Sequence, residues 1–246
     1  MIDRPVSISR ETYTFLCEWE NLGEPHVTIG GGERWYPAER GSLAPRVLDE
    51  LREHGLASGN RVSDDFLDAM VISQRAAAEY YTFATVEGER ATARTAAIGR
   101  DALLIVQVGD GPIELEPIPH DQTRVRLVAA LPATPAARVH SASCAPEDLE
   151  AVVQGGRLPP SGSASDAKRI ARWLEHEHTG RGPLHVAIRD GVNSRRTSAK
   201  PHPQWVDTEQ GRLLLSRDER GWLNLTGADL TTLAGHLDVL EQRLRG

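Results

Sequence analysis

Four strand-patterned segments followed by one helix-patterned segment occur twice along the chain, and this duplication constrains the fold more than any other feature. In both copies β-branched or apolar residues recur at strand spacing, with turn residues between the segments. The first copy predicts strands at 79–86, 90–98, 102–108 and 112–118 and a helix at 121–131. The second predicts strands at 184–189, within 196–208, at 211–217 and at 222–225, and a helix at 228–245. Two units with the same order of elements predict an internal repeat.

Short turns recur at matching places in the two copies, as residues 217–221 match residues 109–111. Because turns this short join neighbouring antiparallel strands, each copy predicts a four-stranded meander with a helix on its apolar face. Two such units can share one sheet or one core. We therefore predict an α+β fold in a single domain over 1–246, with pseudo-twofold related halves at about 1–135 and 136–246.

The segments outside the two meanders predict further helices, one strand and a loop. Helices are predicted at 43–55, 64–73, 146–154 and 166–178, and a strand at 136–144. Residues 155–165 are rich in Gly, Pro and Ser, which pack poorly. This composition predicts a flexible linker near 155–165.

Leucines recur at alternating spacings of three and four residues along the last predicted helix. They are Leu230, Leu233, Leu237, Leu240 and Leu244, and Thr226 with Asp229 forms a capping-box pattern before them. A helix of this kind is typical of packing against the core of its own chain. A homodimer seam stays open as an alternative.

Charge and hydropathy exclude several classes of protein. The formal net charge of −7 argues against nucleic-acid binding, which relies on a basic surface. The longest apolar run, at 102–108, falls far short of the roughly 20 residues that a membrane helix needs, and the first residues do not resemble a signal peptide. Cys17 and Cys144 are the only cysteines and are predicted to be inert thiols. We therefore predict a cytoplasmic protein without membrane insertion.

No motif in the sequence builds an active site. His176 and His178 are two residues apart, whereas zinc-binding helices space their histidines four apart. The glycines at 30–32 lack the Gly-Lys-Ser/Thr continuation of a phosphate loop, and no Gly-x-Ser-x-Gly motif occurs. We predict no catalytic, cofactor-binding or metal-binding residue, and hence a protein that is not an enzyme.

A second hypothesis is a small-molecule-binding or enzymatic domain with its pocket between the two halves. Ligand pockets commonly lie at such junctions. His140 or His185 would supply polar groups there. A deep cavity with convergent ionisable side chains would favour this hypothesis, and a shallow apolar sheet face would favour a protein-binding role.

Three segments in order along the chain resemble the EspG-type chaperones associated with type VII (ESX) secretion in actinobacteria. Residues 15–25, from Phe15-Leu-Cys-Glu-Trp19 to Leu22-Gly-Glu-Pro25, are similar to the opening motif of that family. Residues 39–56, with Glu39-Arg40 and a closing Gly55-Leu56, resemble its first long helix. Residues 205–212, Trp-Val-Asp-Thr-Glu-Gln-Gly-Arg, resemble its W-x-D-T-x-x-G-R turn.

The resemblance implies an α+β fold with internal pseudo-twofold symmetry and a cytosolic chaperone without cofactors. Its partner would be a helical secretion substrate of the PE/PPE type or of the WXG type, bound at the apolar tip of a helical hairpin and kept soluble until export. A partly apolar sheet face can cover such a tip with roughly 800 Å² per partner. Because buried Trp often dominates interfaces, we predict Trp205 and Trp222 as partner-binding anchors, with core packing as the alternative for both.

Overall fold

The computed structural model describes residues 1–29, 37–156, 163–190 and 196–246, without the side chains of residues 37–40. The glycines at 30–32 and the centre of the predicted linker, including Pro159 and Pro160, lie outside these residues. The flexibility predicted for residues 155–165 therefore stays a prediction.

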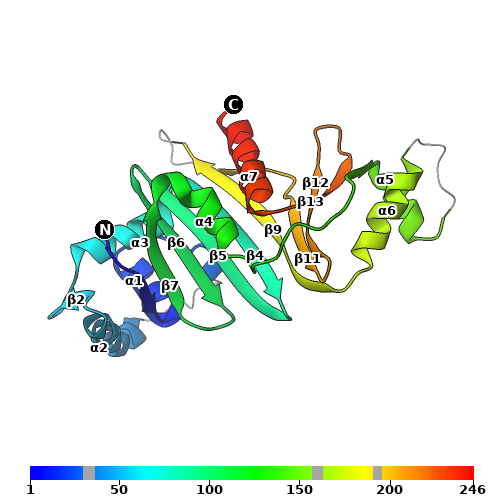
Figure 1. Ribbon diagram of the computed structural model, residues 1–246. Helices are drawn as coiled ribbons and strands as arrows, with labels where there is room; N and C mark the ends of the chain where they lie inside the picture. The colour runs from blue at the N-terminus through cyan, green and yellow to red at the C-terminus, as the bar shows by residue number, and fades with distance from the viewer. Residues whose placement is uncertain (30–36, 157–162, 191–195) are drawn as a thin grey trace.

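An eleven-stranded antiparallel sheet organises the described residues (Figure 1). Its strand order is β1-β7-β6-β5-β4-β9-β11-β12-β13-β8, and β10 also pairs with β9. The strands are β1 (Val6–Ile8), β4 (Ala78–Val86), β5 (Glu89–Ile98), β6 (Asp101–Val108), β7 (Ile113–Pro119), β8 (Ala142–Cys144), β9 (His178–Arg189), β10 (Arg196–Ser198), β11 (Gln204–Thr208), β12 (Gly211–Arg217) and β13 (Leu223–Gly227). A separate small hairpin joins β2 (Ala57–Ser58) to β3 (Arg61–Val62).

Helices lie before, between and after the two meanders, and all but α1 follow the order that the sequence predicts. They are α1 (Arg10–Trp19), α2 (Pro37–Glu53), α3 (Asp64–Arg75), α4 (Thr123–Ala129), α5 (Pro146–Val153), α6 (Ala164–Leu174) and α7 (Leu230–Arg245), with 3₁₀ turns η1 (Val27–Ile29) and η2 (His120–Gln122). The α+β prediction with an antiparallel sheet is confirmed.

The two meanders meet where β4 pairs antiparallel with β9, with Tyr81 opposite His185. From this junction the sheet runs outward through β5, β6, β7 and β1 on one side, and through β11, β12, β13 and β8 on the other. The structural repeat therefore includes one more strand in each arm than the sequence analysis assigned to the meanders. The boundary between the halves near residue 135 stays a prediction.

One face of the sheet is covered at its middle by α4 and α7, which contact each other (Figure 1). Leu127 of α4 and Leu233 and Leu237 of α7 are fully buried in one cluster with Tyr80 of β4 and Trp205 of β11. The leucine stripe of α7 therefore packs inside the chain, as the sequence favours. Most of this stripe is unavailable for a homodimer seam.

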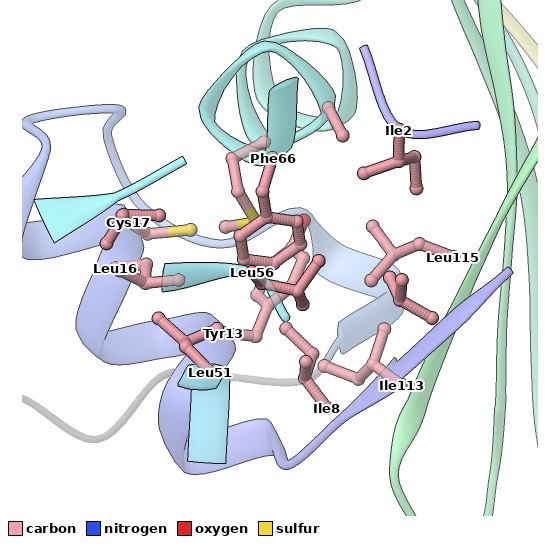
Figure 2. Packing of buried hydrophobic residues seen from close by; sticks show 14 of the residues in the cluster. Ile2, Ile8, Tyr13, Leu16, Cys17, Leu51, Leu56, Phe66, Ile113 and Leu115 are labelled. Carbon is pink, nitrogen blue, oxygen red and sulfur yellow. The ribbon is translucent and has the colours of Figure 1, made fainter. Parts of the chain in front are cut away.

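The opposite face is covered at its two ends (Figure 1). Figure 2 shows the first end, where Tyr13, Leu16 and Phe66 from the N-terminal helices pack on Ile113 and Leu115 of β7. At the other end α5 and α6 pack on β8 and β11–β13 in a third cluster. The middle of this face, over β4 and β9, lies between the two helical groups.

The largest difference from the sequence prediction is in β9, which begins at His178 and not at residue 184. The helix predicted at 166–178 ends earlier, at Leu174, so residues 178–183 are strand. Two glycines and a proline in residues 178–183 weaken the strand pattern. The structure explains the glycines. A Cβ on Gly180 would lie 3.1 Å from the Trp205 ring, and one on Gly182 would overlap the carbonyl oxygen of Phe83.

Other differences are smaller. Only Ala142–Cys144 of the predicted strand 136–144 is strand, and α1 was not predicted as a helix. The side chain of Ser9 starts α1 by accepting from the Thr12 N–H. Asp229 caps α7 by accepting from the Thr232 N–H at 2.8 Å, so the cap lies at Asp229 and not at Thr226.

Residues 205–212 bind the segment around residues 132–135, which connects the two halves, through hydrogen bonds. Arg212 donates from Nε and Nη2 to the Asp207 carboxylate at 2.6 and 2.7 Å, and its Nη2 also donates to the Pro132 carbonyl at 2.7 Å. The Thr134 hydroxyl donates to Asp207 at 2.8 Å. Gly211 has φ +114°, and a Cβ there would lie 2.7 Å from the Pro135 carbonyl oxygen. This motif therefore has a structural role.

Replacing Gly211 by Ala should lower the free energy of unfolding by about 1–3 kcal/mol, because the new Cβ meets both a positive φ and the crossing chain. The control is Gly235→Ala in α7, where a Cβ has open space. It should raise stability by up to about 1 kcal/mol. Urea unfolding of both variants measures this, and equal effects would contradict the role given to Gly211.

Candidate functional site

The two predicted anchors lie in different surroundings. Trp205 is fully buried, its indole N–H is 3.2 Å from the Thr82 hydroxyl, and the Arg212 guanidinium lies over its ring at 5.3 Å. Trp222 precedes β13 and is 38% exposed. Since an anchor must reach its partner, the position of Trp205 is that of a core residue. The role of Trp222 stays a prediction.

The middle of the sheet, between the two helical groups, carries a set of aromatic, histidine and charged side chains, here called the central face. It consists of Glu79, Tyr81 and Phe83 of β4, His185 of β9, Arg196 of β10, His202 of the β10–β11 connection, His26 just before η1, and Val27 of η1. The residues on β4 alternate along the strand, so their side chains share one face of the sheet. Phe83 is 37% and Val27 61% exposed.

Ring contacts hold the central face together. The rings of Tyr81 and His185, opposite each other on β4 and β9, stack in parallel with centroids 4.4 Å apart. His202 lies against His185 at 3.9 Å, and Phe83 meets both Tyr81 and His185 edge to face. His26 approaches the other side of Tyr81 at 5.0 Å. Such packing fixes the orientation of the rings before any partner arrives.

A buried carboxylate lies beneath the rings. Glu79 is 4% exposed, accepts from Arg196 Nε, and has an oxygen 3.5 Å from Arg94 Nη1 and 3.3 Å from His26 Nε2. Burial by itself would raise the pKa of Glu79, but His26 and the two guanidinium groups outweigh it and lower that pKa to about 2. Glu79 is therefore ionised at neutral pH and holds Arg196 in place beside Tyr81.

The histidines of the central face are neutral at pH 7. Burial, followed by the proximity of His202, Arg196 and His26, lowers the pKa of His185 to about 4. Burial is also the main cause of the lowered pKa values of His26 and His202. Both ring nitrogens of His185 are shielded from water, and among the residues that the structure describes they have no hydrogen-bond partner. The histidine rings of this face are thus uncharged, and the charges beside them, Glu79 and Arg196, are paired with each other.

This arrangement fits binding better than catalysis. Among the described residues no group of three or more His, Cys, Asp or Glu side chains is placed to hold a metal ion. His140, the other histidine named for a pocket between the halves, is exposed and its carbonyl accepts from Arg169 of α6. The structure does not bring it to His185, and the small-molecule hypothesis stays untested.

Sequence reasoning found His185 but missed Tyr81, Phe83, His26 and Arg196. Alternation of Tyr81 and Phe83 along a strand was a visible signal that they share a face. The pairing of β4 with β9 and the approach of η1 were not visible, because both join segments far apart in the sequence. The set therefore exists only in the folded chain.

Comparisons with known proteins agree on the fold. A family model described as the EspG family matches residues 9–238. A solved structure of the Mycobacterium tuberculosis type VII secretion system chaperone EspG5 in complex with a PE25–PPE41 dimer matches with a TM-score of 0.70 and 13% identity, over 96% of this chain and 95% of the other. No curated protein sequence matches. Within the described ranges, no helix combines the length and apolarity needed to cross a membrane.

Replacing His185 by Gln should flatten the fall in stability on acidification. The pKa of His185 is about 4 when folded and near 6.5 otherwise, so the unfolded state takes up the proton first and stability is lost as pH falls from about 6.5 to about 4. Between pH 7 and pH 5 the variant should lose about 2–4 °C less in Tm than the wild type, allowing for the partly exposed ring.

The matched control is His120→Gln, because His120 is exposed in η2. Its Tm should follow the wild-type pH profile. Thermal unfolding followed by circular dichroism at several pH values makes the comparison, and identical profiles for all three proteins would rule out a lowered pKa at His185.

Proposed function

The chain belongs to the EspG family, and from this premise we propose that it is a type VII secretion chaperone that binds a helical substrate of the PE/PPE or WXG type in the cytoplasm and keeps it soluble for export. The observation that carries the proposal is the match of almost the whole chain, in both directions, to the structure of EspG5 in complex with PE25–PPE41. The duplicated sheet with helical groups at its ends is the shared architecture. In this proposal the protein is not an enzyme.

We place the client on the central face. Phe83 and Val27 expose apolar surface there, and the partly exposed rings of His185 and His202 add uncharged surface. A helix tip lying between the α1–α3 group and the α5–α6 group could bury about 800 Å² on each partner, the size of a standard interface. Trp222, partly exposed on the second half, is proposed as an additional anchor.

This surface suits a client that would otherwise aggregate. An apolar helix tip exposed to water is an aggregation hazard, and covering it removes apolar area from solvent at about 25 cal/mol per Å². The rings are already packed and Glu79 holds Arg196, so little side-chain freedom remains to be lost on binding. The central face is therefore preorganised for an apolar partner.

Phe83→Asp should abolish the recovery of a client with this protein. The test is co-expression with a candidate helical secretion substrate of the PE/PPE or WXG type from the same host, followed by affinity purification. A carboxylate at the centre of an apolar interface should weaken binding by about 100-fold or more, which corresponds to about 2.7 kcal/mol. Trp222→Ala should weaken binding less, as expected for an anchor at the edge.

The matched control is Val108→Asp, an exposed strand residue at the end of β6. This variant should recover the client like the wild type. Loss of binding in both variants, or in neither, would count against the central face as the client site. A client that stays soluble alone and does not bind the wild type would count against the chaperone function itself.

A further inference from the structure

A small cavity lies between the C-terminal part of α7, the chain joining β10 to β11, and the end of β12. Its volume is about 170 Å³. The polar and basic side chains that line it are Ser198, Lys200, Ser216, Arg217, His236 and Arg243. All residues of its lining are described by the structure, and none of them is acidic. This set is called the basic cavity below.

Three separate elements supply the lining. His236 and Arg243 are seven residues apart on α7, two helical turns, so they share the helix face that also carries the buried Leu240. Ser216 and Arg217 end β12, Ser198 ends β10, and Lys200 lies in the β10–β11 connection. The charges therefore converge only through the fold.

The cations of the basic cavity are poorly neutralised. Within the described ranges neither Lys200 nor Arg217 has an ion pair or a side-chain hydrogen bond. Arg243 Nη2 lies 3.6 Å from Glu219, with both side chains at least half exposed, and such a pair contributes little. In a chain of net charge −7, three basic groups without an acid in their cavity attract an anion.

The helix dipole does not account for this gathering of charge. Arg243 lies in the last turn of α7, where a cation interacts favourably with the helix C-terminus. Lys200 and Arg217 belong to other elements, so this effect does not explain them. The hydroxyls of Ser198 and Ser216 add donors of the kind that oxyanion sites use.

We propose that the basic cavity is a binding site for a single small oxyanion group, a phosphate or a carboxylate. Its volume lies below the roughly 300–1,000 Å³ of sites for drug-sized ligands, so it takes one such group and not a nucleotide. Arg217 and Arg243 supply planar guanidinium donors that match oxyanion geometry, and Lys200 supplies a point charge. The basic cavity shares no residue with the central face, although, after burial, the nearby Lys200 also lowers the pKa of His202. The proposal does not rest on the chaperone function.

The test is calorimetric titration of the purified full chain with sodium phosphate, and separately with sodium succinate, at constant ionic strength set with chloride. Saturable binding in the millimolar range or tighter is expected for at least one of the two anions. The double variant Lys200→Gln/Arg217→Gln should bind about tenfold or more weakly. Both residues are exposed, so the variant should fold, which its circular dichroism and Tm check.

The control variant is Arg61→Gln, which removes one positive charge outside the basic cavity. Arg61 is exposed and pairs with Asp64 at 2.9 Å. It should bind within about twofold of the wild type. NMR locates the site independently, because the imidazole signals of His236 should shift on titration while those of exposed His120 should not.

A second set of titrations, with peptides, identifies the source of the anion. A peptide with a free C-terminal carboxylate that binds more tightly than its amide, and more tightly than phosphate, would identify a polypeptide end as the ligand. Tighter binding of phosphate would identify a free anion. No saturable binding of any of these anions, or equal binding by the double variant and the wild type, would overturn the proposal.

Discussion

The antiparallel pairing of β4 with β9 is the constraint on which the rest of the structure depends. It joins two meanders into one sheet, so that α4 and α7 come together on one face and Tyr81 comes to stack on His185 on the other. Gly180 and Gly182 permit it, because side chains there would meet the Trp205 ring and the backbone of β4. Strands usually carry larger apolar residues at buried positions. Glycine at both positions therefore indicates that the backbones and the Trp205 ring must approach closely at this junction.

Two buried carboxylates, Glu79 of β4 and Asp207 of β11, lie near this junction and fix the positions of the side chains around them. Glu79 holds Arg196 and approaches Arg94 and His26, and Asp207 holds Arg212 against the crossing chain. The desolvation of such pairs offsets much of their attraction, so they add little net stability over apolar packing. Removing one partner would instead leave a buried charge unpaired, at a cost of about 3–5 kcal/mol. We infer that Glu79 fixes the position of Arg196 on the central face and that Asp207 fixes the segment linking the two halves.

The two faces of the sheet differ in what covers them at the middle. On one face α4 and α7 bury the leucine stripe, and Arg124 ties them by donating to Glu241 at 2.7 Å and to the Tyr80 hydroxyl at 3.0 Å. On the other face, Phe83 and Val27 stay exposed. The first face is covered by its own helices, and the second keeps apolar surface exposed, where we propose that the client binds. The basic cavity lies at the C-terminal part of α7 and shares no residue with the central face.

Local pattern determined the strands of the first meander, most of α7 and the order of elements, since alternation and turn residues act over a few neighbours. The 205–212 motif was also visible in the sequence, as was the exposed Trp222. Sequence alone misread residues 178–183, where glycines that serve packing look like a loop, and it proposed Trp205 as an anchor although its ring lies in the core. It could not bring together Tyr81, His185 and His26, or Lys200, Arg217 and Arg243, because long-range strand pairing and helix docking set those distances. The sequence by itself therefore determined the elements and their duplication, and only the tertiary structure decided which surfaces they leave open, because burial depends on neighbours that are distant in the chain.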